Sequence, residues 1–168
     1  MTKEFTDTKE TIYDFYDLIE VECPDCGSHA IVRNVSDKSG MFSPRRFSCK
    51  KCGKQKEWNE QGLGSITDED PYFGYKLWFL ASSCGHTLYA LNEKHLDFLR
   101  SYVEATQRKR PRKENESEIR NGTLASRFPA WMKSAKNREE VLRSIEKLKH
   151  KKGCANQSAH TTPASAPR

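Results

Sequence analysis

Two closely spaced cysteine pairs constrain the fold of this chain more than any other feature of its sequence. Cys23-Pro24-Asp25-Cys26-Gly27 is followed by Cys49-Lys50-Lys51-Cys52-Gly53, with 22 residues between Cys26 and Cys49. In each Cys-x-x-Cys turn both thiolates point to one side of a tight loop, and the glycine after the second cysteine permits the positive φ that the turn needs. Two such turns can close a tetrahedron of thiolates about 2.3 Å from a zinc ion. The sequence therefore predicts one zinc ion, bound by Cys23, Cys26, Cys49 and Cys52.

Four thiolates saturate a tetrahedral metal, so no position stays open for a water or a substrate. This indicates a structural metal whose binding energy folds a small strand unit around it. A four-thiolate iron site of the rubredoxin type uses the same geometry and stays open as an alternative. A thioredoxin-like redox motif needs one cysteine pair in a βαβ context, and that context is absent here.

Cysteine and histidine residues outside the two pairs form a weaker second candidate for a metal site. Cys84 and His86 could be joined by His95, but this set lacks a matched cysteine pair and its neighbours are apolar. We predict instead that Cys84 is a buried thiol in a hairpin turn with the imidazole of His86 nearby. His29, shortly after Cys26, is predicted to lie at the surface or to contact a ligand.

The order of patterns along the chain predicts a small α+β protein in five parts. An N-terminal zinc ribbon of β-strands is followed by a β-hairpin, a helical basic region and a disordered C-terminal tail. The predicted parts are an N-terminal arm (1–18), the zinc ribbon (19–60), a linker (61–71), a hairpin plus basic helical region (72–152) and the tail (153–168). The tail is predicted from its Ala, Ser, Thr and Pro content.

Three helices are predicted in the second half of the chain. Asn92 is a good N-cap for a helix over 93–108, in which Leu96, Leu99 and Val103 share one face. A short helix is predicted over 123–128. A last helix over 138–150 is predicted to open with a capping box between Asn137 and Glu140.

Charge divides the chain into an acidic front and a basic rear. Residues 1–70 carry 10 Lys/Arg and 14 Asp/Glu, whereas residues 71–168 carry 19 and 9. Cations with aromatic side chains among them are a recurrent means of binding nucleic acid, whether DNA or RNA. A solvated basic surface and core aromatics are the alternative. The predicted contact residues are Arg108, Lys109, Arg110, Arg112, Lys113, Trp131, Lys133, Lys136 and Arg138.

Catalytic and membrane patterns are missing from the sequence. It has no phosphate-binding loop, no Gly-x-Ser-x-Gly and no His-Glu-x-x-His, so we predict no enzyme. Asp68-Glu69-Asp70 is interpreted as a solvated acidic turn. No stretch approaches the about 20 apolar residues of a membrane span, and the polar start lacks a signal-peptide core. A cytoplasmic location without membrane contact is expected.

Several strings besides the zinc motif carry a resemblance to a known family. They are Asp70-Pro71-Tyr72-Phe73-Gly74, Cys84-Gly85-His86-Thr87-Leu88, Leu124-Ala125-Ser126-Arg127-Phe128-Pro129 and Trp131-Met132-Lys133-Ser134-Ala135-Lys136-Asn137-Arg138. With the two cysteine motifs, they resemble a family of small bacterial proteins that contain a transcription-factor-IIB-type zinc ribbon and have no established function. The resemblance spans residues 20–150, in round numbers. It implies a zinc ribbon and a cytoplasmic location.

Two functions fit these patterns, and a ribbon fold does not choose between them. The first is a non-enzymatic nucleic-acid-binding module that uses its basic C-terminal half. The second is a protein-interaction adaptor, in which the ribbon and the aromatic hairpin at 72–91 dock on a protein partner.

Overall fold

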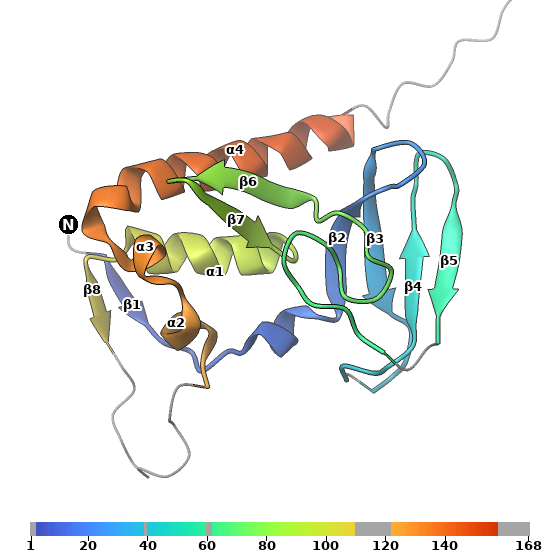
Figure 1. The fold of residues 1–168 in the computed structure, drawn as a ribbon, viewed down its shortest axis with the longest axis horizontal. Coiled ribbons are helices and arrows are strands. Elements are labelled where there is room, and N and C mark those ends of the chain that lie inside the picture. The colour runs from blue at the N-terminus through green and yellow to red at the C-terminus, as the bar shows by residue number, and fades with distance from the viewer. Residues whose placement is uncertain (1–2, 39, 60–61, 110–121, 158–168) are drawn as a thin grey trace, which may run out of the picture.

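The computed structural model describes residues 3–38, 40–59, 62–109 and 122–157. Within these ranges the chain forms eight strands, four α-helices and two short 3-10 helices, so the prediction of a small protein of mixed strands and helices is confirmed. Figure 1 shows a four-stranded sheet beside a layer of helices. The elements are β1 (Glu4–Thr6), η1 (Ile12–Phe15), β2 (Leu18–Glu22), β3 (His29–Asn34), β4 (Arg45–Ser48), β5 (Gln55–Trp58), β6 (Phe79–Ser83), β7 (His86–Ala90), α1 (Glu93–Glu104), β8 (Gln107–Lys109), α2 (Leu124–Arg127), α3 (Ala130–Lys133), η2 (Ala135–Asn137) and α4 (Arg138–Gln157).

Strands β2 to β5 form one antiparallel sheet in the order β2-β3-β4-β5. Successive side chains of a strand point to opposite faces, and this alternation buries Val21, Val32 and Phe47 completely. Residues 72–75 cover the buried face, where the rings of Phe47 and Tyr75 meet edge to face with centroids 4.9 Å apart. The opposite face of β3, β4 and β5 carries polar and charged side chains.

Strands β6 and β7 form the predicted hairpin, and the turn between them consists of Cys84 and Gly85. Both residues have positive φ, 51° at Cys84 and 75° at Gly85. Two consecutive residues of this kind match the right-handed twist of a two-residue hairpin. The turn therefore requires Cys84 to adopt a conformation that only glycine adopts without cost.

Helices α1 and α4 pack on each other and on the hairpin (Figure 1). The side chain of Asn92 accepts a hydrogen bond of 2.9 Å from the backbone N–H of His95, which confirms the predicted N-cap of α1. The apolar stripes of both helices are buried as their spacing predicts. The buried residues are Leu96, Phe98, Leu99, Tyr102 and Val103 in α1 and Val141, Ile145 and Leu148 in α4.

Residues 3–18 are built into the same core as the helices. Strand β1 pairs in parallel with β8, and the ring of Phe5 lies edge-on to Tyr102 with centroids 5.2 Å apart. The amide of Asn92 donates to the carbonyl oxygens of Phe15 and Leu18, at 2.9 and 2.6 Å. One asparagine thus caps α1 and fixes the segment that leads into the sheet.

Helix boundaries differ from the predicted ones where long-range contacts intervene. Helix α1 ends at Glu104 rather than 108, because Ala105 is extended and the next residues join β1 as β8. Helix α4 continues to Gln157, past the start of the tail predicted as disordered, and residues 158–168 of that tail lie outside the described residues. The residues predicted to share a capping box bind elsewhere: Asn137 donates to the Trp131 carbonyl, and Glu140 accepts from the Cys84 N–H.

Asp70 is buried, so the interpretation of a solvated acidic turn is wrong at this residue. Its carboxylate accepts backbone N–H groups from Tyr72 and Phe73, both at 3.0 Å, and from Tyr75 at 2.7 Å. Burial raises the pKa of Asp70, and the three N–H donors offset part of that cost. The carboxylate organises the loop that covers the sheet.

His95 gives a testable dependence of stability on pH. It is buried, accepts the Leu91 N–H at Nδ1 and stacks on Phe15 with centroids 4.8 Å apart. Burial lowers the pKa of His95 to about 4, whereas an unfolded chain titrates near 6.5. Between these values the unfolded state binds the extra proton, so stability falls as pH falls through this window, by up to about 3 kcal/mol.

Urea unfolding at several pH values measures this loss. His95→Asn keeps a hydrogen-bond acceptor near the Leu91 N–H but cannot be protonated, and we expect a shallower pH dependence for this variant. Other titrating groups contribute equally to both proteins, so the difference isolates the imidazole. Identical slopes in wild type and variant would show that His95 does not titrate in this way.

Candidate metal centre

The two cysteine pairs lie in matching turns at one end of the sheet. The first turn joins β2 to β3, and the second joins β4 to β5. In the first, Gly27 N–H donates to the Cys23 carbonyl at 2.8 Å, and in the second, Gly53 N–H donates to the Cys49 carbonyl at 3.0 Å. The two glycines have φ of 67° and 76°, which confirms the conformation predicted for these positions.

The four cysteine sulfurs form one compact cluster. Their Sγ atoms all lie within 4.8 Å of one another, and the pairs Cys23–Cys52 and Cys26–Cys49 are 3.6 Å apart. A disulfide bond would need about 2.05 Å, and all four thiols are free. A tetrahedron with metal–sulfur bonds of about 2.3 Å has edges of about 3.8 Å. The cluster is therefore compatible with one metal ion at its centre.

Backbone N–H groups near the sulfurs favour the thiolate form, which is the form that binds a metal ion. Hydrogen bonds from Ser28, first from its backbone N–H and then from its side chain, lower the pKa of Cys26 to about 6. The backbone N–H of Lys54 acts likewise on Cys52, but burial and the crowding of the other three sulfurs outweigh it and raise the pKa of Cys52 to about 12. The Cys26 thiol therefore ionises readily, whereas the Cys52 thiol resists ionisation beside the other sulfurs. A dication at the centre would offset the repulsion between neighbouring thiolates.

The other cysteine and histidine candidates stay apart from this cluster. Among the described residues, the four cysteines are the one group of three or more such side chains close enough to share a metal. His86 stacks on Trp131 with centroids 5.0 Å apart, and His95 is in the core. His29 bonds to Glu20 at 2.7 Å. Cys84 is in the hairpin turn as predicted, half-buried rather than fully buried.

The cations predicted to contact nucleic acid bind backbone carbonyls. Arg108 lies over the Tyr102 ring, 4.4 Å from its centroid, and donates to the carbonyl of Tyr102. Lys133 donates to the Ser126 carbonyl at 3.0 Å. Arg138 donates to the Ala105 carbonyl at 3.2 Å, and Lys136 is exposed. Within the described residues, these four cations form no ion pair with a carboxylate.

The other residues of the predicted nucleic-acid site do not share these carbonyl contacts. Arg110, Arg112 and Lys113 lie outside the described residues, and Lys109 is the last residue of β8. Trp131 is half-buried and one face of its ring stacks on His86. Other cations of the basic rear are paired with acids: Lys151 with Glu22 at 2.8 Å, and Lys149 with Asp97.

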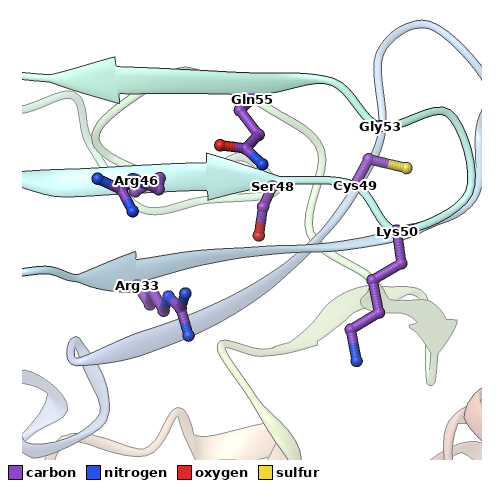
Figure 2. Close-up of a pocket in the computed structure, with 7 residues that line it drawn as sticks. All are labelled: Arg33, Arg46, Ser48, Cys49, Lys50, Gly53 and Gln55. Carbon is purple, nitrogen blue, oxygen red and sulfur yellow. The ribbon is translucent and has the colours of Figure 1, made fainter.

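A second group of cations, on the sheet itself, was not singled out from the sequence. Arg33, Arg46 and Lys50 line a hollow of about 330 Å³ together with Ser48, Cys49, Gly53 and Gln55 (Figure 2). The charge count did not reveal these three cations, because they belong to residues 1–70, the acidic front of the chain. Strand alternation could have shown that Arg33 and Arg46 share a face, but not that they are directly opposite each other.

Comparison of the chain with known protein families, with curated proteins and with solved structures gave no match. Among the residues that the structure describes, none of the helices combines the length and apolar content needed to cross a lipid bilayer. The function is therefore inferred from the chemistry of this chain's own residues.

Proposed function

We propose that this protein is a non-enzymatic zinc-ribbon protein that binds nucleic acid through its basic C-terminal half. The observation that carries the proposal is the compact cluster of four cysteine sulfurs, with pairs 3.6 Å apart across two matching turns. Four thiolates fill a tetrahedral zinc ion and leave no position for a reacting water. A metal of this kind stabilises a binding surface rather than performing a reaction.

The nature of the partner is inferred from charge. Lys133, Lys136 and Arg138 follow one another closely between α3 and α4 and form no ion pair within the described residues. Cations that are not neutralised by carboxylates gain most from displacing counterions on phosphates. This group, with Arg108 and the partly exposed ring of Trp131, is the surface that we assign to nucleic acid.

The adaptor function is less well supported, because the hairpin's aromatic residues are used inside the fold. Tyr72, Trp78 and Phe79 are buried. Tyr72 also donates to the Met41 carbonyl at 2.9 Å and packs on Trp58. Phe73, Tyr75 and Tyr89, the other aromatic residues of 72–91, are half-buried, so each has only part of its surface free for a protein partner.

Salt dependence of binding tests the nucleic-acid proposal. The logarithm of the binding constant for single- or double-stranded DNA or RNA should fall linearly with the logarithm of salt concentration, with a slope of about −0.7 to −0.9 per phosphate contacted. Protein purified free of nucleic acid is required. No salt-sensitive binding to any of these at low salt would refute the proposal.

Neutralising the assigned cations should change that slope. Lys133→Gln combined with Lys136→Gln removes two charges, and we expect weaker binding and a slope flatter by about 1.5. Lys94→Gln is the control, because Lys94 is also exposed but pairs with Glu10 at 3.1 Å. It removes one charge rather than two, so an effect half as large as that of the double variant would mean that total charge, rather than this surface, governs binding.

A further inference from the structure

The polar face of the sheet concentrates positive charge beside the cysteine cluster. Arg33 comes from β3, Arg46 from β4, and Lys50 from the second cysteine turn. In Figure 2 their side chains lie on the same side of the sheet around one hollow, and the Sγ of Cys49 points away from Arg33 and Lys50. No carboxylate lines this hollow.

The register of the strands makes this arrangement unfavourable for an isolated protein. Arg33 and Arg46 are direct neighbours across β3 and β4, and like charges directly opposite each other destabilise a sheet. Glu57, opposite Arg46 on β5, relieves part of this repulsion through contacts of 2.9 Å to Nε and 2.7 Å to a terminal nitrogen. Within the described residues, Arg33 and Lys50 form no ion pair, so two positive charges remain available.

We propose that this hollow binds a phosphate group of a nucleic-acid backbone, as a second contact region in addition to the basic C-terminal half. The inference rests on the proposed function and names a different surface for it. A phosphate group supplies the negative charge that would offset the repulsion between Arg33 and Arg46. Guanidinium groups bind phosphate oxygens in a planar, two-pronged geometry. Lys50 adds a compact ammonium group.

Neutral donors and the shape of the hollow suit the same ligand. The hydroxyl of Ser48 and the amide of Gln55 come from directly opposed positions on β4 and β5 and line the hollow. Hydroxyl and amide groups are common partners of phosphate oxygens beside Arg and Lys. All these contacts would be to the backbone, so the hollow is expected to bind nucleic acid without reading its sequence.

The test compares one double variant with a single-residue control in a labelled-oligonucleotide binding assay at low salt. Arg33→Gln with Lys50→Gln should weaken binding by about tenfold and flatten the salt slope by about 1.5. Lys56→Gln is the matched control: it removes a cation from the same sheet, but Lys56 lies over the Phe73 ring, 5.6 Å from its centroid, on the opposite face. We expect this control to bind nearly as wild type.

A change in the opposite direction strengthens the test. Glu57→Gln frees the charge of Arg46 and should tighten binding, whereas Asp37→Asn, which removes an exposed acid in a loop, should have a smaller effect. Zinc content and thermal midpoint must match wild type in every variant used. These readouts separate a binding defect from misfolding.

The outcomes distinguish this inference from the function on which it rests. If wild type fails to bind any oligonucleotide, both fall. If wild type binds but Arg33→Gln with Lys50→Gln binds equally well, the proposed phosphate site in the hollow is refuted. The proposed contact surface in the C-terminal half is then retained. Lys56→Gln removes one charge rather than two, so weakening half as large on a logarithmic scale would also refute the phosphate site, because it would show an effect of total charge alone.

Discussion

Replacing Cys23 by serine is expected to unfold the four-stranded sheet and to lower the metal content from one ion per chain to near zero. Binding of zinc by four cysteines contributes about 10 kcal/mol or more to folding, which is comparable to the entire stability of a small domain. Val21, Val32 and Phe47 are on the buried face of the sheet, and residues 72–75 cover that face. Elemental analysis and amide hydrogen exchange of the strands measure the two effects.

Cys84→Ser is the control for that experiment, because Cys84 is a free cysteine outside the cluster. We expect unchanged metal content and an intact sheet. Loss of metal in this variant would show that the assigned ligand set is wrong. A wild-type protein that is folded without metal would refute the structural role, and iron in place of zinc would favour the rubredoxin-type site.

Asp70→Ala is expected to cost about 3–5 kcal/mol of unfolding free energy. The substitution leaves the N–H groups of Tyr72, Phe73 and Tyr75 without their acceptor in a buried loop, and each buried unsatisfied donor costs about 1–3 kcal/mol. Urea unfolding gives the loss directly. The loop covers Phe47 and its neighbours, so the tyrosine fluorescence of the native state should change as well.

Asp68→Ala supplies the comparison, because Asp68 is exposed and its carboxylate accepts from the neighbouring Thr67 hydroxyl. We expect a change within about 0.5 kcal/mol. Equal costs at the two positions would mean that Asp70 stabilises the loop through charge rather than through its three hydrogen bonds.

Features encoded within a few residues could be predicted from the sequence. Each Cys-x-x-Cys-Gly turn is local, and the sulfur cluster requires two copies of it at one end of a sheet. The N-cap of α1 is also local, since Asn92 and His95 are one turn apart. The apolar stripe of α4 follows from its spacing alone.

Features that depend on partners far along the chain could not be predicted. Asp70 is buried because its own loop folds back over the sheet. The side chain of Glu140 reaches from α4 to the hairpin turn, where it accepts the Cys84 N–H. The charge count placed Arg33 and Arg46 in the acidic half, whereas the register between β3 and β4 sets them side by side. Sequence composition cannot reveal a pairing that two separate strands create.

The parallel pairing of β1 with β8 delays the folding of the N-terminal segment during synthesis. Lys3 and Thr106, joined by a hydrogen bond, are 103 positions apart in the chain. The ribosome makes the N-terminal segment first, so Phe5 must wait without its partners until α1 and β8 have emerged. The sheet of β2 to β5 has all its strands and cysteines much earlier and can bind its metal first. The N-terminal segment is therefore expected to dock after the sheet has formed, although it is made first.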